Sequence, residues 1–116
     1  QGIVGEFGGP ISAYPWERRH ELLDGVALVV NATSQGMVGN PPLDIRLDKL
    51  PASALAADII YIPLETPFLA AARQRGNKTV NGLGMLMHQV RPAWKAWFGI
   101  DPEMKAELRA LVEKTI

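Results

Sequence analysis

The chain contains no cysteine among its 116 residues. This absence excludes disulfide bridges and thiolate metal sites, and it fits a reducing cytoplasm. Twelve basic and twelve acidic side chains cancel, so no net field favours nucleic acid or an anionic membrane surface. No apolar stretch approaches the ~20 residues that are needed to cross a bilayer. These absences predict a cytoplasmic protein with no nucleic-acid or membrane partner.

The first residues have no initiator Met, and they lack the basic and apolar regions of a signal peptide. They are typical of an interior point in a longer gene product, so we expect the chain to be part of a longer protein. Hydrophobic residues make up 47% and charged residues 21%, which is an ordinary globular composition. The length suits one compact domain and not two.

Apolar runs of strand length alternate with helix signals along the chain. The predicted strands are 11–14, 26–30, 57–61 and 79–81, and the predicted helices are 15–23, 66–75, 82–98 and 101–116. The run at 26–30 has no polar alternation, which is typical of a strand covered on both faces of a parallel sheet. Thr66-Pro67 favours a helix start and Gly76 its end. The pattern predicts an α/β fold with a parallel sheet and helices on both faces.

Polar or small residues follow three of these strands directly, at 31–37, 61–66 and 81–89. In an open parallel sheet, ligands bind beyond the carboxyl ends of the strands, so the three segments are expected to face one crevice. Each segment taken alone has a simpler interpretation, such as a turn that only satisfies its own backbone or a half-buried core tyrosine. The Gly82-Leu83-Gly84 segment lacks the third glycine of a dinucleotide fingerprint. Neither His20 nor His88 has further ligands at metal spacing, so no metal site is predicted.

The same three segments resemble consecutive motifs of shikimate dehydrogenases. They read VVNATSQGM at 29–37, DIIYIPLETPFL at 58–69 and NGLGMLMHQ at 81–89. Their order and spacing are those of the family, and the resemblance extends from about Phe7 to the end of the chain. It implies reduction of 3-dehydroshikimate to shikimate with NADPH, in chorismate and aromatic amino acid biosynthesis. It also implies that residues 1–116 are the C-terminal part of the NADP-binding domain, including the helices at 82–98 and 101–116.

The resemblance further implies which residues contact the cofactor and the substrate. The implied contacts of NADP are Asn31, Ala32, Thr33, Ser34, Ile59, Gly82 and Met85. The implied contacts of shikimate are Tyr61 and Gln89. Residues 59 and 61 point to the same side of a strand, and Gln89 shares a helix face with Met85. A buried glutamine needs partners for both ends of its amide, which a polyhydroxylated substrate supplies.

Several parts of the family pattern have no match in this chain. The proton-transfer lysine and aspartate, the glycine-rich phosphate turn and the segment that grips the 2′-phosphate all lie outside it. No catalytic residue is therefore assigned here, and the isolated chain is predicted to be inactive. The expected fold is a partial doubly wound (Rossmann-like) sheet that lacks its first two strands. The bare edge of the strand at 26–30 predicts an edge-mediated homodimer.

Two alternatives remain open from the sequence. The first is a quinate/shikimate dehydrogenase that uses NAD, because the segment that selects between NAD and NADP is not present. The second is a non-catalytic Rossmann-like interaction module that keeps the fold.

Overall fold

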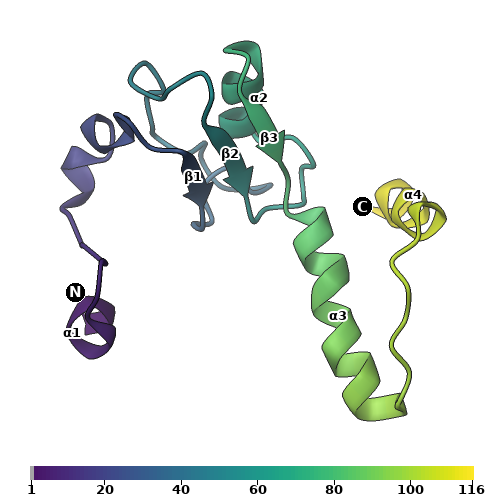
Figure 1. The fold of residues 1–116 in the computed structure, drawn as a ribbon. Helices are drawn as coiled ribbons and strands as arrows, with labels where there is room; N and C mark the ends of the chain where they lie inside the picture. The colour runs from purple at the N-terminus through teal and green to yellow at the C-terminus, as the bar shows by residue number, and fades with distance from the viewer. Residues whose placement is uncertain (1) are drawn as a thin grey trace.

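A three-stranded parallel sheet forms the centre of the computed structural model, which describes residues 2–116 (Figure 1). Its strands are β1 (Leu28–Asn31), β2 (Leu55–Asp58) and β3 (Lys78–Val80). They lie in the order β1-β2-β3, so strands that are consecutive in the chain are neighbours in the sheet. This confirms the predicted α/β class with a parallel sheet.

Helices connect and follow the strands. They are α1 (Gly2–Phe7), α2 (Pro67–Gln74), α3 (Leu83–Phe98) and α4 (Ala106–Thr115), with the 3-10 turns η1 (Trp16–Arg18) and η2 (Glu21–Leu23). The Thr66 side chain accepts a hydrogen bond from the Leu69 backbone N–H at 3.3 Å, as its predicted capping role requires. Gly99 ends α3 in the left-handed conformation, at φ 72°.

The hydrophobic core lies on one face of the sheet, beneath α2. The residues that form it are Leu23, Leu47, Leu50, Ala54, Ala56, Phe68, Leu69 and Ala72. Helix α2 presents Phe68, Leu69 and Ala72 to this core, and β2 contributes Ala56. Since side chains alternate along a strand, Asn31 and Asp58 share this core face with Val29 and Ala56.

Within residues 2–116, no helix covers the opposite face of the sheet. Leu28 is 52%, Val30 48% and Val80 51% exposed, and by alternation these side chains project from that face. The prediction that β1 is covered on both faces is therefore wrong for residues 2–116. Helix α2 covers the core face, and α3 extends away from the sheet and does not pass back across it (Figure 1).

Four local predictions differ from the structure. The predicted helix at 15–23 is replaced by the two separate 3-10 turns η1 and η2. Residues 11–14 form no strand, because no neighbouring strand pairs with them, and Ile11 and Tyr14 are exposed. The last helix begins at Ala106 and not at 101, because the Asp101 carboxylate is hydrogen-bonded to Arg91 and caps no helix. The sheet ladder of the second strand ends at Asp58, earlier than predicted, because the Asp58 side chain takes the Ile60 N–H.

The structure also has a short helix, α1, that the sequence did not predict. It buries no residue and lies apart from the sheet (Figure 1). Among residues 2–116, no helix has the length and apolar character to cross a membrane.

Candidate functional site

A cavity of about 400 Å³ lies beyond the carboxyl ends of β1 and β2, next to the first turns of α3. Its lining residues are Thr33, Met37, Val38, Ile59, Ile60, Tyr61, Ile62 and Met85. Four of them, Thr33, Ile59, Tyr61 and Met85, are predicted site residues from all three segments singled out in the sequence. The expected crevice is therefore present in the structure.

Backbone hydrogen bonds hold the three segments together around this cavity. The Ile59 N–H donates to the Asn31 carbonyl oxygen at 3.1 Å, which joins the ends of β1 and β2. The Val38 N–H donates to the Ile62 carbonyl at 3.3 Å, which folds the loop after β1 over the strand end. The Gly82 N–H donates to the Ile60 carbonyl at 2.8 Å, which adds the third segment. Fixed backbone geometry thus sets the cavity walls.

Gly82 lies so close to the second segment that any side chain there would force the two backbones apart. A Cβ atom at this position would lie 1.9 Å from the Ile59 carbonyl oxygen and 2.7 Å from that of Ile60. Its own carbonyl accepts the Leu86 N–H at 3.0 Å, as the first hydrogen bond of α3. A carbonyl oxygen has two lone pairs, so one remains for a ligand.

Asn31 lies beneath the cavity and points inward. It is 3% exposed, and its Nδ2 donates to Asp58 Oδ2 at 3.1 Å and to the Gln35 carbonyl at 3.0 Å. Its Oδ1 accepts from the Thr33 N–H at 3.1 Å and from Thr33 Oγ1 at 2.7 Å. All hydrogen-bonding groups of this side chain are used within the protein, so Asn31 supports the turn from below.

Asp58 shares this buried network. It is also 3% exposed, and it accepts from Thr66 Oγ1 at 2.8 Å and from the Ile60 N–H at 2.9 Å, in addition to Asn31. Every partner is a donor, which is what an acceptor-only carboxylate requires. An acidic residue within an apolar strand is the sequence signal that could have identified it.

Three further predicted site residues are exposed and do not line the cavity. Ala32 and Ser34 are exposed on the turn after β1. Gln89 is exposed on α3, one turn beyond Met85, and it does not line the cavity. The sequence analysis missed Met37, Val38 and Ile62, which form much of the apolar wall.

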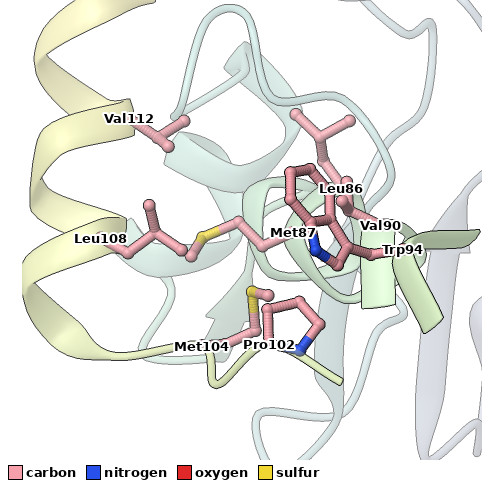
Figure 2. A pocket seen from close by; sticks show the side chains of 8 residues that line it. All are labelled: Leu86, Met87, Val90, Trp94, Pro102, Met104, Leu108 and Val112. Atoms are coloured by element: carbon pink, nitrogen blue, oxygen red, sulfur yellow. The ribbon is translucent and has the colours of Figure 1, made fainter. Parts of the chain in front are cut away.

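A second cavity, of about 490 Å³, separates α3 from α4 (Figure 2). Its lining is apolar and comes from α3, the segment that follows α3, and α4. The lining residues are Leu86, Met87, Val90 and Trp94 of α3, and Pro102, Met104, Leu108 and Val112 of the following segment and α4. Figure 2 shows the two methionine side chains between the helices. The lining offers no charged side chain to orient a polar ligand, so this space is better explained as an apolar helix–helix contact.

Two arginine side chains connect the C-terminal part of the chain to α3 and its start. Arg91 on α3 donates to both Asp101 carboxylate oxygens, at 2.9 and 3.0 Å. This hydrogen-bonded pairing holds the pKa of the Asp101 carboxyl below its ordinary value. On α4, Arg109 reaches Asn81 at 3.4 Å and so approaches the start of α3. Across the described part of the chain, no three acidic or histidine side chains gather in a way that could hold a metal ion.

The parallel sheet and the crevice beyond its carboxyl ends define the Rossmann-like α/β class that binds dinucleotides. Within this class, the chain is a homologue of the NADP-dependent shikimate dehydrogenases, which confirms the resemblance seen in its motifs. It is 50% identical over 111 residues to shikimate dehydrogenase (NADP(+)) of Nitrobacter winogradskyi, a match covering 96% of this chain and 40% of the relative.

Two solved structures are similar to this chain. Shikimate 5-dehydrogenase from Thermus thermophilus, in complex with NADP(H) and shikimate, matches with a TM-score of 0.72 at 31% identity, over 97% of this chain and 39% of that one. Quinate dehydrogenase from Corynebacterium glutamicum, in complex with NAD, matches with a TM-score of 0.68 at 29% identity, over 82% and 32%. No family model matches the chain. The chain spans about 40% of the length of the curated relatives that it matches.

Proposed function

We propose that residues 1–116 are the C-terminal part of the NADP-binding domain of a shikimate dehydrogenase that reduces 3-dehydroshikimate to shikimate with NADPH. The observation that carries this proposal is the 400 Å³ cavity, in which Thr33, Ile59, Tyr61 and Met85 meet. The relative from Thermus thermophilus holds both NADP(H) and shikimate. Cytoplasmic chorismate biosynthesis is the corresponding proposed setting.

In this proposal the cofactor's nicotinamide occupies the apolar part of the cavity. Ile59 and Met85 offer flat apolar contact to the ring. The Gly82 carbonyl keeps one lone pair for the nicotinamide amide. The turn Asn31–Ser34 lies at the diphosphate and ribose side, with Ala32, Thr33 and Ser34 as contacts and Asn31 as their support.

The substrate contacts in this proposal are Tyr61 and Gln89. Tyr61 is half-buried and lines the cavity, so its hydroxyl serves as a polar group at an apolar wall. Gln89 lies one turn along α3 from Met85 with its amide exposed. A hydroxylated ring acid held between them would satisfy both ends of that amide.

The isolated chain is proposed to be inactive. Tyr61 is the only titratable residue that lines the cavity within residues 2–116. The family assigns proton transfer to a lysine and an aspartate with no counterpart here, and a general acid must lie within hydrogen-bond reach of the atom that it serves. Binding and positioning are therefore the roles proposed for this chain.

Two observations favour further possibilities. The likeness to a quinate dehydrogenase that binds NAD keeps a quinate/shikimate dehydrogenase using NAD as the alternative enzyme. The edge position of β1 and its exposed Leu28 and Val30 favour a homodimer through this strand, and with it the alternative of a non-catalytic interaction module. Exposed strand edges pair readily with another chain.

The four methionines offer a direct test of the binding proposal. Met37 and Met85 line the candidate cavity, whereas Met87 and Met104 line the second cavity, between α3 and α4. With ¹³C-labelled methionine methyl groups, NADP⁺ should shift the resonances of the first pair and leave the second pair in place. Shikimate added next should perturb the Tyr61 ring.

Shifts confined to Met87 and Met104, or no shift at millimolar NADP⁺, would contradict the proposal. NAD⁺ serves as the matched competitor, and a larger response to NAD⁺ than to NADP⁺ would favour the alternative enzyme. Mixing NADPH with 3-dehydroshikimate and the isolated chain should produce no loss of NADPH absorbance.

A further inference from the structure

The buried carboxylate of Asp58 has no role in the function proposed above. It lies at the end of β2, below the cavity, and burying a charge is costly unless its hydrogen bonds are satisfied. Among residues 2–116, its partners are three donors and no cation: Asn31 Nδ2, Thr66 Oγ1 and the Ile60 N–H. A leucine or an alanine would fill a core position without this cost, so the carboxylate calls for an explanation.

The carboxylate determines which way the Asn31 side chain faces. Because both Asp58 oxygens only accept hydrogen bonds, Asn31 must present its Nδ2 to Asp58. Its Oδ1 then faces the following turn, where it accepts from the Thr33 N–H and Oγ1. The Thr33 hydroxyl in turn accepts from the Gln35 N–H at 3.1 Å. One amide orientation thus sets the path of residues 31–35.

The same carboxylate acts on the second wall of the cavity. Its Oδ1 accepts the Ile60 N–H at 2.9 Å, which ends the ladder of β2 and turns the backbone between Ile59 and Tyr61. Through Thr66, whose hydroxyl also caps α2, the network is tied to the core. Two of the three segments around the cavity therefore depend on one side chain.

We propose that Asp58 is a positioning residue of the cofactor site, acting through Asn31 on the Thr33 turn and through Ile60 on the adjoining strand end. The inference rests on the proposed function, because it assigns the cavity to a cofactor. Asp58 does not touch the ligand; it sets the shape of two walls that do.

The Asp58→Asn substitution is nearly isosteric and replaces one acceptor by a donor. The single remaining oxygen cannot accept from both the Ile60 N–H and Asn31 Nδ2, so one of these two bonds must be lost. If Asn31 rotates to restore its pairing, its Nδ2 faces the Thr33 N–H, and that bond is lost instead. Exchanging the two residues, as Asn31→Asp with Asp58→Asn, restores the pairing and leaves an acceptor for Thr33, while the bond to the Gln35 carbonyl is lost.

Amide hydrogen exchange without any ligand tests whether Asp58 holds the Thr33 turn and the Ile60 backbone in place. We expect Asp58→Asn to accelerate exchange at the Ile60 N–H by about tenfold or more, because this N–H binds the carboxylate itself. If the Thr33 N–H loses its bond instead, its exchange should accelerate by about two- to tenfold, because its acceptor is the neutral Asn31 amide. The double variant, Asn31→Asp with Asp58→Asn, should recover most of the protection against exchange at the Thr33 N–H. Asn77→Ala is the matched control, because Asn77 is another buried asparagine that binds carbonyls of 51, 52 and 54. It should lower stability with no selective effect at Thr33.

A second measurement uses the unsubstituted chain, in case Asp58→Asn does not fold. The Asn31 side-chain amide protons should exchange about tenfold or more slowly than those of the exposed Asn40. Equal rates would overturn the proposal. Unchanged Thr33 and Ile60 protection in a folded Asp58→Asn variant would overturn it as well.

Adding NADP⁺ separates this inference from the proposed function. If NADP⁺ shifts the methyl resonances of Met37 and Met85 in the unsubstituted chain, Asp58→Asn should weaken NADP⁺ binding. The double variant, with Asn31→Asp added, should recover that binding. Equal binding by Asp58→Asn would refute the positioning role. If NADP⁺ shifts neither methionine, the proposed function fails, and the exchange data still show whether Asp58 shapes the turn.

Discussion

Substituting Gly82 by alanine tests the geometry on which the candidate site depends. The backbone at Gly82 has φ −78° and ψ −5°, a conformation that alanine adopts readily. Without tertiary contacts, Gly82→Ala would therefore stabilise the protein by about 0.4–1 kcal/mol, through a less flexible unfolded chain. The sign of the measured effect depends entirely on the space around the new methyl group.

That space is occupied by backbone. The new Cβ would lie 1.9 Å from the Ile59 carbonyl oxygen and 2.3 Å from its carbon. Contacts under 3.0 Å do not occur for real Cβ atoms, so the segments must separate by about 1 Å (3.0 minus 1.9 Å), and the Gly82–Ile60 hydrogen bond is lost. Overpacking costs about 1–3 kcal/mol and the lost hydrogen bond about 1 kcal/mol. After the gain of about 0.4–1 kcal/mol from the less flexible unfolded chain is subtracted, we expect a net destabilisation of about 1–3.5 kcal/mol.

Urea unfolding followed by circular dichroism measures this change, and Gly84→Ala is the matched control. A Cβ at Gly84 would meet only the end of the Arg109 side chain, at 3.7 Å. This variant should be as stable as the unsubstituted chain or up to about 1 kcal/mol more stable. If Gly82→Ala unfolds at the same urea concentration as Gly84→Ala, the close approach of the third segment is wrong, and so is the cavity built on it.

Other parts of the structure give further expectations. Because Arg91 lowers the pKa of Asp101, the pair stabilises the fold above the ordinary carboxyl pKa. The stability difference between the unsubstituted chain and Asp101→Asn in urea titrations should disappear as pH falls through the lowered value. Thr66→Ala removes the α2 cap and a donor to Asp58, so it should cost about 2 kcal/mol or more in the same assay. Leu28→Glu places a charge on the exposed edge strand and should abolish any concentration-dependent dimer seen by light scattering.

Local signals in the sequence predicted the elements whose ends are determined locally. Thr66-Pro67 and Gly76 predicted the bounds of α2, because a cap and a left-handed glycine act within one turn. The start of α4 was wrong because a residue ten positions away, Arg91, takes the Asp101 side chain. A side-chain pairing of that kind leaves no periodic signal in the sequence.

The residues of the candidate site also differ in whether local sequence signals could predict them. Thr33, Ile59, Tyr61 and Met85 were implied by the resemblance of three motifs to shikimate dehydrogenases, and the parallel sheet brings these motifs together. Met37 and Val38 were missed because they reach the cavity only when the loop folds back onto Ile62, through the Val38 N–H bond to its carbonyl. Nothing in a loop sequence specifies such a return.

The two faces of the sheet explain why the Asn31–Asp58 network beneath the cavity is held more firmly than the methionines that line it. Asn31 and Asp58 project to the face that α2 covers, and Thr66 joins them to the first turn of that helix. Their network therefore shares the stability of the core and opens only when the core opens. Met37 and Met85, at the rim, are each 44% exposed and can adjust to a ligand at little cost. A rigid polar network beneath an adaptable apolar wall is the arrangement that the proposed cofactor site requires, because the network would hold the turn after β1 in place while the wall adjusts to a ring.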